Sequence, residues 1–118
     1  MFTNCTGLKT LIVEEGAEHI SGFNGCTSLT NISLPSTLRA IDNFSECTSL
    51  TSVTLPENLE TIGYKAFKDC TSLRYINIPN SVLYIGDYAF VNCNSILNLE
   101  LPNALISIGV SAFAGSSI

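Results

Sequence analysis

Apolar and polar positions follow one another in a fixed order between Ala66 and Gly86, and the same order returns before and after this stretch. The residues between the apolar positions are mostly polar. The apolar positions are Ala66, Phe67, Cys70, Leu73, Ile76, Ile78, Val82 and Ile85. A pattern that returns at a fixed period is typical of repeat proteins, in which each unit stacks on the next.

Four columns of identical residues define the register of the repeat. The spacing within every column is first 21 and then 23 residues, and all four columns change spacing at the same copy. The columns are Phe at 2, 23, 44, 67, 90 and 113, Cys at 5, 26, 47, 70 and 93, Pro at 35, 56, 79 and 102, and Ile at 20, 41, 62, 85 and 108. The register predicts a single domain over residues 1–118, with copies at 2–22, 23–43, 44–66, 67–89 and 90–112 and a partial sixth at 113–118.

Each copy divides into three segments. Residues 51–55 (TSVTL) alternate polar and apolar side chains, which predicts a half-buried strand ended by Pro56. The L-x-x-I segment that follows predicts a second short extended or turning piece. Apolar residues from Ala66 to Leu73 recur at helical spacing, which predicts a helix of about two turns. The expected class is therefore an α/β repeat, in which stacked copies pair their strands into a parallel sheet.

The five cysteines occupy one repeat position, so they point the same way in successive layers. The pattern favours a ladder of buried free thiols that act as small hydrophobic side chains. A disulfide between adjacent layers is the alternative, and it requires favourable Cβ geometry. We expect no zinc site, because the chain has no CxxC pair and a single histidine.

Two segments carry a specific repeat motif. The pattern CxxLxxIxLPxxLxxIGxxAFxxC is matched by residues 47–70 (CTSLTSVTLPENLETIGYKAFKDC) and by residues 70–93 (CTSLRYINIPNSVLYIGDYAFVNC). The chain resembles BspA-like leucine-rich repeats over essentially its whole length. That resemblance implies a right-handed solenoid with a parallel sheet on the concave face and short helices or turns on the convex face. It also implies an extracellular or cell-surface location, adhesion or protein binding, and no catalysis.

The concave strand face is the main candidate for binding a partner. Tyr75 beside Arg74 resembles an interface hot spot, since both residue types are enriched there. The candidate residues are Asn31, Ser33, Ser52, Thr54, Arg74, Tyr75, Asn77, Asn98 and Glu100, and Thr10 and Ile12 hold the same positions in the first copy. A face that is merely solvated is the alternative for these residues.

Other polar and aromatic groups offer weaker candidates. Tyr64, Tyr84 and Tyr88 lie away from the strand positions and could form a second contact patch. His19 lies near three glutamates, but a solvated polar turn is the expected role of this segment. The sequence shows no Ser/His/Asp arrangement and no phosphate-binding glycine loop, so we expect no enzyme and no cofactor.

Charge and hydropathy limit the classes of partner. A net charge of −5 argues against nucleic acid and against an anionic membrane surface. No apolar run reaches the roughly 20 residues of a membrane span, and no signal peptide is expected because Met1 is followed directly by the repeat residue Phe2. The expected function is binding of an extracellular protein or glycoprotein, and the alternative is a structural spacer in a larger surface protein. We also expect end-to-end self-association or continuation into further repeats.

Overall fold

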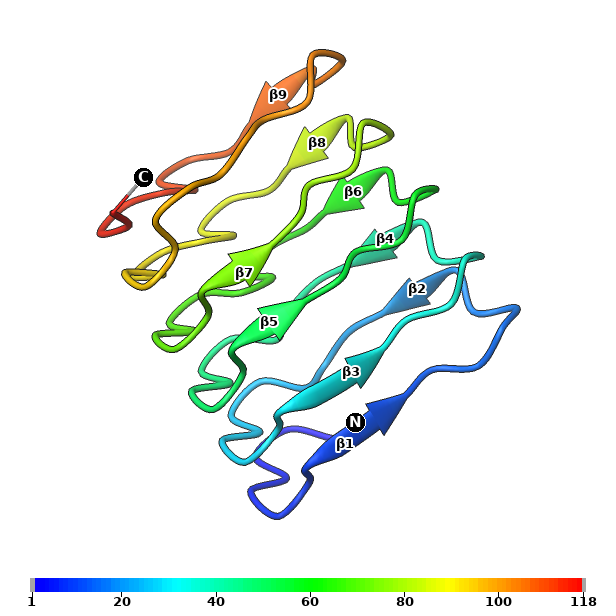
Figure 1. The fold of residues 1–118 in the computed structure, drawn as a ribbon, viewed down its shortest axis with the longest axis vertical. Helices are drawn as coiled ribbons and strands as arrows, with labels where there is room; N and C mark the ends of the chain where they lie inside the picture. The colour runs from blue at the N-terminus through cyan, green and yellow to red at the C-terminus, as the bar shows by residue number, and fades with distance from the viewer. Residues whose placement is uncertain (1, 118) are drawn as a thin grey trace.

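The computed structural model describes residues 2–117; Met1 and Ile118, the last residue of the partial sixth copy, lie outside the described residues. The chain winds into a stack of layers, each layer formed by one repeat (Figure 1). Within the described range the chain forms nine short strands and no helix. The strands are β1 (Thr10–Ile12), β2 (His19–Ile20), β3 (Asn31–Ser33), β4 (Ala40–Ile41), β5 (Ser52–Val53), β6 (Thr61–Ile62), β7 (Tyr75–Ile76), β8 (Tyr84–Ile85) and β9 (Ser107–Ile108).

The continuous sheet runs through the L-x-x-I segments. Its strands are parallel and follow the order β2-β4-β6-β8-β9. Ile20 pairs with Ile41, and Ile62 pairs with Ile85, so the register reproduces the spacing of the isoleucine column. The expected parallel-sheet solenoid is confirmed, but the sequence analysis placed the main sheet on the other strand segment.

The strands of the TSVTL-type segments pair only two by two. β1 pairs with β3, and β5 pairs with β7, while no ladder joins β3 to β5 within the described residues. Residues 98–100 form no strand, although the same positions are strands in earlier copies. This side of the solenoid is therefore less regular than the five-stranded side.

The helix expected between Ala66 and Leu73 is absent, and the segment forms consecutive turns instead. Lys65 (φ 53°) and Asp69 (φ 59°) adopt left-handed backbone conformations, which an α-helix does not admit. The amide of Phe67 donates to the carbonyl of Ala89 (2.7 Å), in the stacked turn segment 22 residues further along the chain, rather than to a carbonyl of its own turn. The helical part of the expected α/β class is therefore not confirmed, and turns take its place, because helical spacing is also produced by turns that bond between layers.

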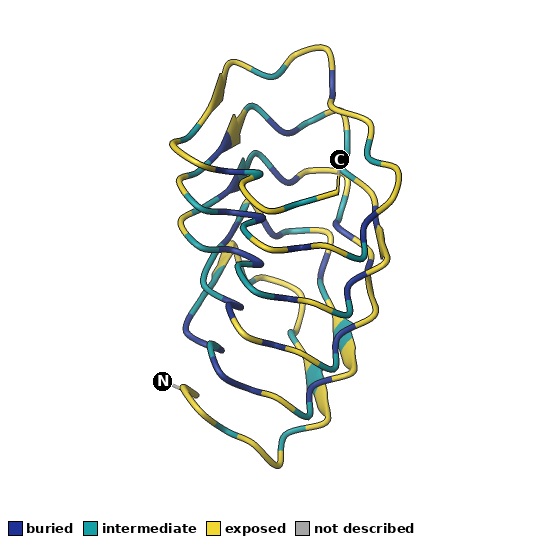
Figure 2. Ribbon diagram, turned by 90° about the vertical axis from the view of Figure 1, so that its left-hand side faces the viewer, coloured by how far each residue is buried: buried dark blue, intermediate teal, exposed yellow. Residues whose placement is uncertain are grey.

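The core lies between the strand segments and the turn segments, and the middle layers are the most completely buried (Figure 2). Six phenylalanine rings stack along the solenoid with centroids 5.0–6.3 Å apart. Phe44, Phe67 and Phe90 are 0% exposed, whereas Phe2 at the start of the stack is 55% exposed. The column predicted from the sequence is thus a continuous aromatic core.

All five cysteines are free thiols, as the column pattern favoured, and four of them are buried. Each of these four thiols donates to the carbonyl oxygen of the phenylalanine one layer back. The pairs are Cys26–Phe2 (3.1 Å), Cys47–Phe23 (3.4 Å), Cys70–Phe44 (3.2 Å) and Cys93–Phe67 (3.0 Å). Ser116 continues the column, and its hydroxyl bonds the carbonyl of Phe90 at 3.3 Å. The cysteine position therefore links adjacent layers as well as filling space.

Candidate functional site

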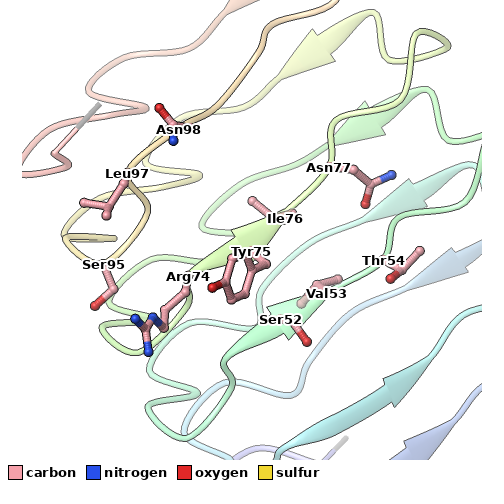
Figure 3. Close-up of a pocket in the computed structure, with 10 residues that line it drawn as sticks. All are labelled: Ser52, Val53, Thr54, Arg74, Tyr75, Ile76, Asn77, Ser95, Leu97 and Asn98. Carbon is pink, nitrogen blue, oxygen red and sulfur yellow. The ribbon is translucent and has the colours of Figure 1, made fainter.

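A hollow lies on the irregular side of the solenoid, over three successive layers. Its volume is about 680 Å³, and it is open to solvent. Arg74 and Tyr75 lie side by side between the residues of β5 and those of the next layer (Figure 3). The lining residues are Ser52, Val53, Thr54, Arg74, Tyr75, Ile76, Asn77, Ser95, Leu97 and Asn98.

Asn77 explains how the layers stay in register beside the hollow. Its side-chain amide donates to the carbonyl of Leu55 (3.1 Å), and its amide oxygen accepts from the Leu55 backbone N–H (2.9 Å). The Asn77 side chain thus continues the β5–β7 ladder by one step. Since both polar groups of the Asn77 side chain form hydrogen bonds with the Leu55 backbone, we assign Asn77 a structural role at the edge of the hollow.

The next layer is not joined to β7 by a strand ladder in the described chain. Residues 97–101 are irregular, and Leu97 is 72% exposed. Just before this stretch, the two layers are joined through the hydroxyl of Ser95, which donates to the carbonyl of Thr71 (2.6 Å). The hollow lies where strand pairing stops.

All nine candidate residues from the sequence are exposed. The structure brings six of them together around the hollow: Ser52, Thr54, Arg74, Tyr75, Asn77 and Asn98. Asn31, Ser33 and Glu100 do not line it. The alternation of strand residues identified outward positions correctly, but it carried no information about which layers open into a hollow.

Leu97 and Ser95 line the hollow and were missed by the sequence analysis. Leu97 stands 23 residues after Arg74, which is the repeat spacing in this part of the chain. The register could therefore have identified it as the partner of Arg74 in the next layer. Val53 and Ile76 were assigned to the core, and their side chains also reach the floor of the hollow; Ile76 is 9% exposed.

Arg74 is the only charged residue that lines the hollow. Its guanidinium forms no ion pair among the described residues, where the pairs are His19–Asp42, Arg39–Glu60 and Lys68–Asp69. Tyr75 is 68% exposed and lies beside it. The hollow therefore combines one free cation and one exposed aromatic ring with small neutral polar groups and Leu97.

Of the three tyrosines considered for a second contact patch, two lie together and the third does not. Tyr64 and Tyr88 meet edge to face with centroids 6.1 Å apart, and the Lys65 ammonium lies 5.1 Å from the Tyr64 ring centroid. Tyr84 belongs to β8, in the five-stranded sheet. The two turn tyrosines thus cover their own segment, and a cation–π contact occupies one of them.

The histidine bonds a carboxylate of the next layer. His19 Nε2 lies 3.1 Å from Asp42 Oδ2, so its partner is not one of the nearby glutamates. Within residues 2–117 no three His, Cys, Asp or Glu side chains are placed to hold a metal ion. The same range contains no helix of the length and apolarity that a membrane crossing requires.

Comparison with known families decides the classification. The family model of the BspA type leucine rich repeat region matches residues 1–43 and 20–118, with six copies. The chain belongs to the BspA-type leucine-rich repeat family. No curated protein matches this BspA-type chain.

Solved structures of bacterial leucine-rich repeat proteins share the fold of this BspA-type chain. A Bacteroides ovatus leucine-rich repeat protein is 41% identical over 89% of the chain, with a TM-score of 0.83. The T. pallidum leucine-rich repeat protein is 31% identical over 97% of the chain, with a TM-score of 0.85. A leucine rich cell surface protein from Faecalibacterium prausnitzii is 28% identical over 98% of the chain, with a TM-score of 0.84.

The BspA-type chain is shorter than these proteins. It spans 28% of the B. ovatus chain, 35% of the F. prausnitzii chain and 66% of the T. pallidum chain.

Proposed function

We propose that this chain is a protein-binding module of a secreted or cell-surface protein, and that it binds an extracellular protein or glycoprotein through the hollow. The observation that carries the proposal is the pairing of Arg74 and Tyr75 in the hollow. Adhesion or contact with a host or partner cell is the role that fits such a module. The name of the F. prausnitzii relative, a cell surface protein, supports the location.

The chemistry of the hollow favours binding over catalysis. Arg74 is its only charged residue, so the lining has no acid–base pair. A large exposed tyrosine beside an arginine is the residue combination that dominates the energetics of many protein interfaces. The small side chains of Ser52, Thr54 and Ser95 leave room for a partner to reach both groups.

The exposed state of these two side chains makes them suitable for a test. Tyr75 is 68% exposed, so its truncation removes little packing and should leave the fold intact. Arg74 has no ion pair to lose within the described chain. A loss of binding in a double variant would therefore report on contact rather than on unfolding.

The experiment immobilises the chain and measures binding to a panel of extracellular-matrix and cell-surface proteins. The test variant is Arg74→Ala/Tyr75→Ala, and the control is Tyr64→Ala/Lys65→Ala, which removes an exposed tyrosine and a cation outside the hollow. We expect the test variant to lose binding and the control to retain it, with both variants folded by circular dichroism. Loss in the control alone would instead place the contact at the turn tyrosines.

A structural spacer is the second candidate. The spacer is favoured by the length of two relatives: this chain spans only 28% of one and 35% of the other, so a stretch of this length forms a minor part of each relative. In that case the repeats extend a larger surface protein and the ligand binds elsewhere. Absence of binding to every panel member by the folded wild-type chain would favour the spacer.

A further inference from the structure

A second, smaller hollow adjoins the hollow around Arg74 on the same side of the solenoid. Its volume is about 290 Å³, and Glu57 is the only charged residue of the described chain that lines it. Asn77 lines both hollows, so the two meet at this residue. Figure 3 shows Arg74 and Asn77 beyond opposite ends of β7. The two hollows thus follow one another along the strand direction and carry single charges of opposite sign.

Both charges are free to meet a ligand. Arg74 and Glu57 are exposed, and neither belongs to any of the three ion pairs formed within residues 2–117. A ligand can therefore approach the guanidinium and the carboxylate without breaking an ion pair of the described chain. Since the two charges are opposite, a complementary ligand carries an anionic group at one end and a cationic group at the other.

The register of β5 and β7 fixes how far apart the two charges lie along the strands. Ser52 pairs with Tyr75, which places Glu57 beside Asn80, six residues beyond Arg74. An extended residue rises about 3.3 Å, so the two charged positions are separated by roughly 20 Å along the strand direction. A ligand that meets both charges must therefore be long and extended.

The backbone around the hollow has groups that an extended peptide can use. β7 pairs only with β5 in the part of the chain that the structure describes, so the other edge of β7 has no strand partner there. Across the hollow, the amides of Leu97 and Asn98 form no backbone hydrogen bond within the same part. A peptide in extended conformation brings both donors and acceptors to such groups.

We propose that the two hollows together bind one extended peptide segment of the partner, with an acidic side chain at Arg74 and a basic side chain about six residues away at Glu57. This inference rests on the proposed function, in which the partner is a protein, and adds the chemistry that the partner presents. Tyr75 contacts the part of the segment next to its acidic residue. A sulfated glycan does not fit this arrangement, because it brings no cation to Glu57.

Selection of a phage library of random dodecapeptides on the immobilised chain tests the proposal. The wild-type chain should enrich peptides with an acidic and a basic residue about six positions apart. Arg74→Glu/Glu57→Lys exchanges the two signs without changing the net charge, so it should enrich peptides of the opposite polarity. Arg74→Glu alone should weaken binding of the best wild-type peptide about tenfold in fluorescence polarisation, because attraction becomes repulsion.

Lys9→Glu is the matched control for Arg74→Glu. Lys9 holds the repeat position of Arg74 in the first copy, is exposed and does not line the hollow. Its reversal changes the net charge by the same amount and should leave binding of the wild-type peptide unchanged. Equal weakening by Lys9→Glu would overturn the proposal, since net charge rather than Arg74 would then govern binding. Circular dichroism checks that all variants are folded.

The remaining outcomes separate this inference from the proposed function. Enriched peptides that lose binding to Tyr75→Ala but carry no charge pair would overturn the inference and leave the proposed function standing. Enriched peptides that bind Tyr75→Ala and the charge variants as well as the wild-type chain would overturn the inference, because they bind outside the hollow. A selection that enriches no peptide would also overturn it. In these last two cases the panel of extracellular proteins decides the proposed function separately.

Discussion

The thiol of Cys93 donates a hydrogen bond to the carbonyl oxygen of Phe67, 3.0 Å away and one layer back in the stack. Phe67 N–H in turn donates to the carbonyl of Ala89, which lies four residues before Cys93 in the turn segment stacked on that of Phe67. The two bonds join the same pair of turn segments in opposite directions. Hydrogen bonds from a cysteine side chain and from the backbone thus both link the turn segments of successive layers.

Replacement of Cys70 should separate the hydrogen bond from the packing. Cys70→Val fills the space but leaves the carbonyl of Phe44 without its thiol donor (3.2 Å). An unsatisfied buried carbonyl costs about 1–3 kcal/mol. Cys70→Ser keeps a donor, as Ser116 does naturally, so in urea unfolding the valine variant should lose more stability than the serine variant. A valine variant as stable as the wild type would mean that the thiol bond contributes nothing.

The buried thiols should make the protein less stable in alkali. Burial raises the pKa of Cys47 and of Cys93 from 9.0 to about 12. In the unfolded chain these thiols lose protons near pH 9, whereas in the folded chain they keep them, so stability falls as pH rises from about 9 towards 12. Between pH 9 and 11, Cys47→Ser/Cys93→Ser should show a shallower decline in urea unfolding free energy. Equal slopes in the two proteins would contradict this assignment.

Gly86 should not tolerate a side chain, because two layers approach closely there. A Cβ atom at Gly86 would lie 2.8 Å from the backbone carbon of Gly63 and 2.9 Å from the Tyr64 nitrogen. Overpacking of this kind costs about 1–3 kcal/mol. Gly7→Ala is the control, since a Cβ there meets no atom within 4 Å. Thermal melts should show a lower Tm for Gly86→Ala only; an unchanged Tm would mean that the layers are not stacked this closely.

The phenylalanine column should contribute to stability in proportion to burial. Phe67 is 0% exposed, and its replacement by alanine should cost about 3–5 kcal/mol, the range for a buried aromatic side chain. Phe2→Ala should cost much less, because Phe2 is 55% exposed. Chemical denaturation of both variants measures the difference. Similar small losses at both positions would show that the rings do not form the core.

Asn77 should act on stability rather than on binding. Asn77→Ala removes both hydrogen bonds to Leu55, each of which contributes about 0.5–1.5 kcal/mol. We therefore expect a lower free energy of unfolding and, at temperatures where the variant is folded, unchanged affinity for any partner of the hollow. A loss of affinity with unchanged stability would instead make Asn77 a contact residue.

The sequence predicted the repeat register and the core because identical residues recur at the spacing of the layers. It did not distinguish a helix from turns at Ala66–Leu73, since apolar spacing is the same for both. The left-handed backbone conformations of Lys65 and Asp69 rule out the helix, and the sequence did not predict these conformations. The shared repeat position of the cysteines predicted a ladder of buried thiols. The hydrogen bond from each buried thiol to a phenylalanine carbonyl could not be predicted, because it depends on where the preceding layer lies.

The hollow could be predicted only in part. Strand alternation places Tyr75 on the surface, because neighbouring residues of a strand point to opposite faces and Ile76 points inward. Arg74 precedes the strand, so alternation does not place it. The opening beside them depends on where strand pairing stops, at residues 97–101, and the sequence of this copy follows the same pattern as the copies that do pair. Leu97 at the repeat position of Arg74 and Glu100 at that of Asn77 are departures that the sequence shows.

Hydrogen exchange of the wild-type chain, measured residue by residue, tests most directly whether one side of the solenoid is closed and the other open at the hollow. The amides of Gly63 and Gly86, which donate to Ile41 and Ile62 at 2.7 Å, should exchange slowly. The amides of residues 97–101 should exchange quickly, because no strand pairing holds them. Protection of residues 97–101 equal to that of Gly86 would contradict the account, since it would mean that the ladder is closed where we place the binding site.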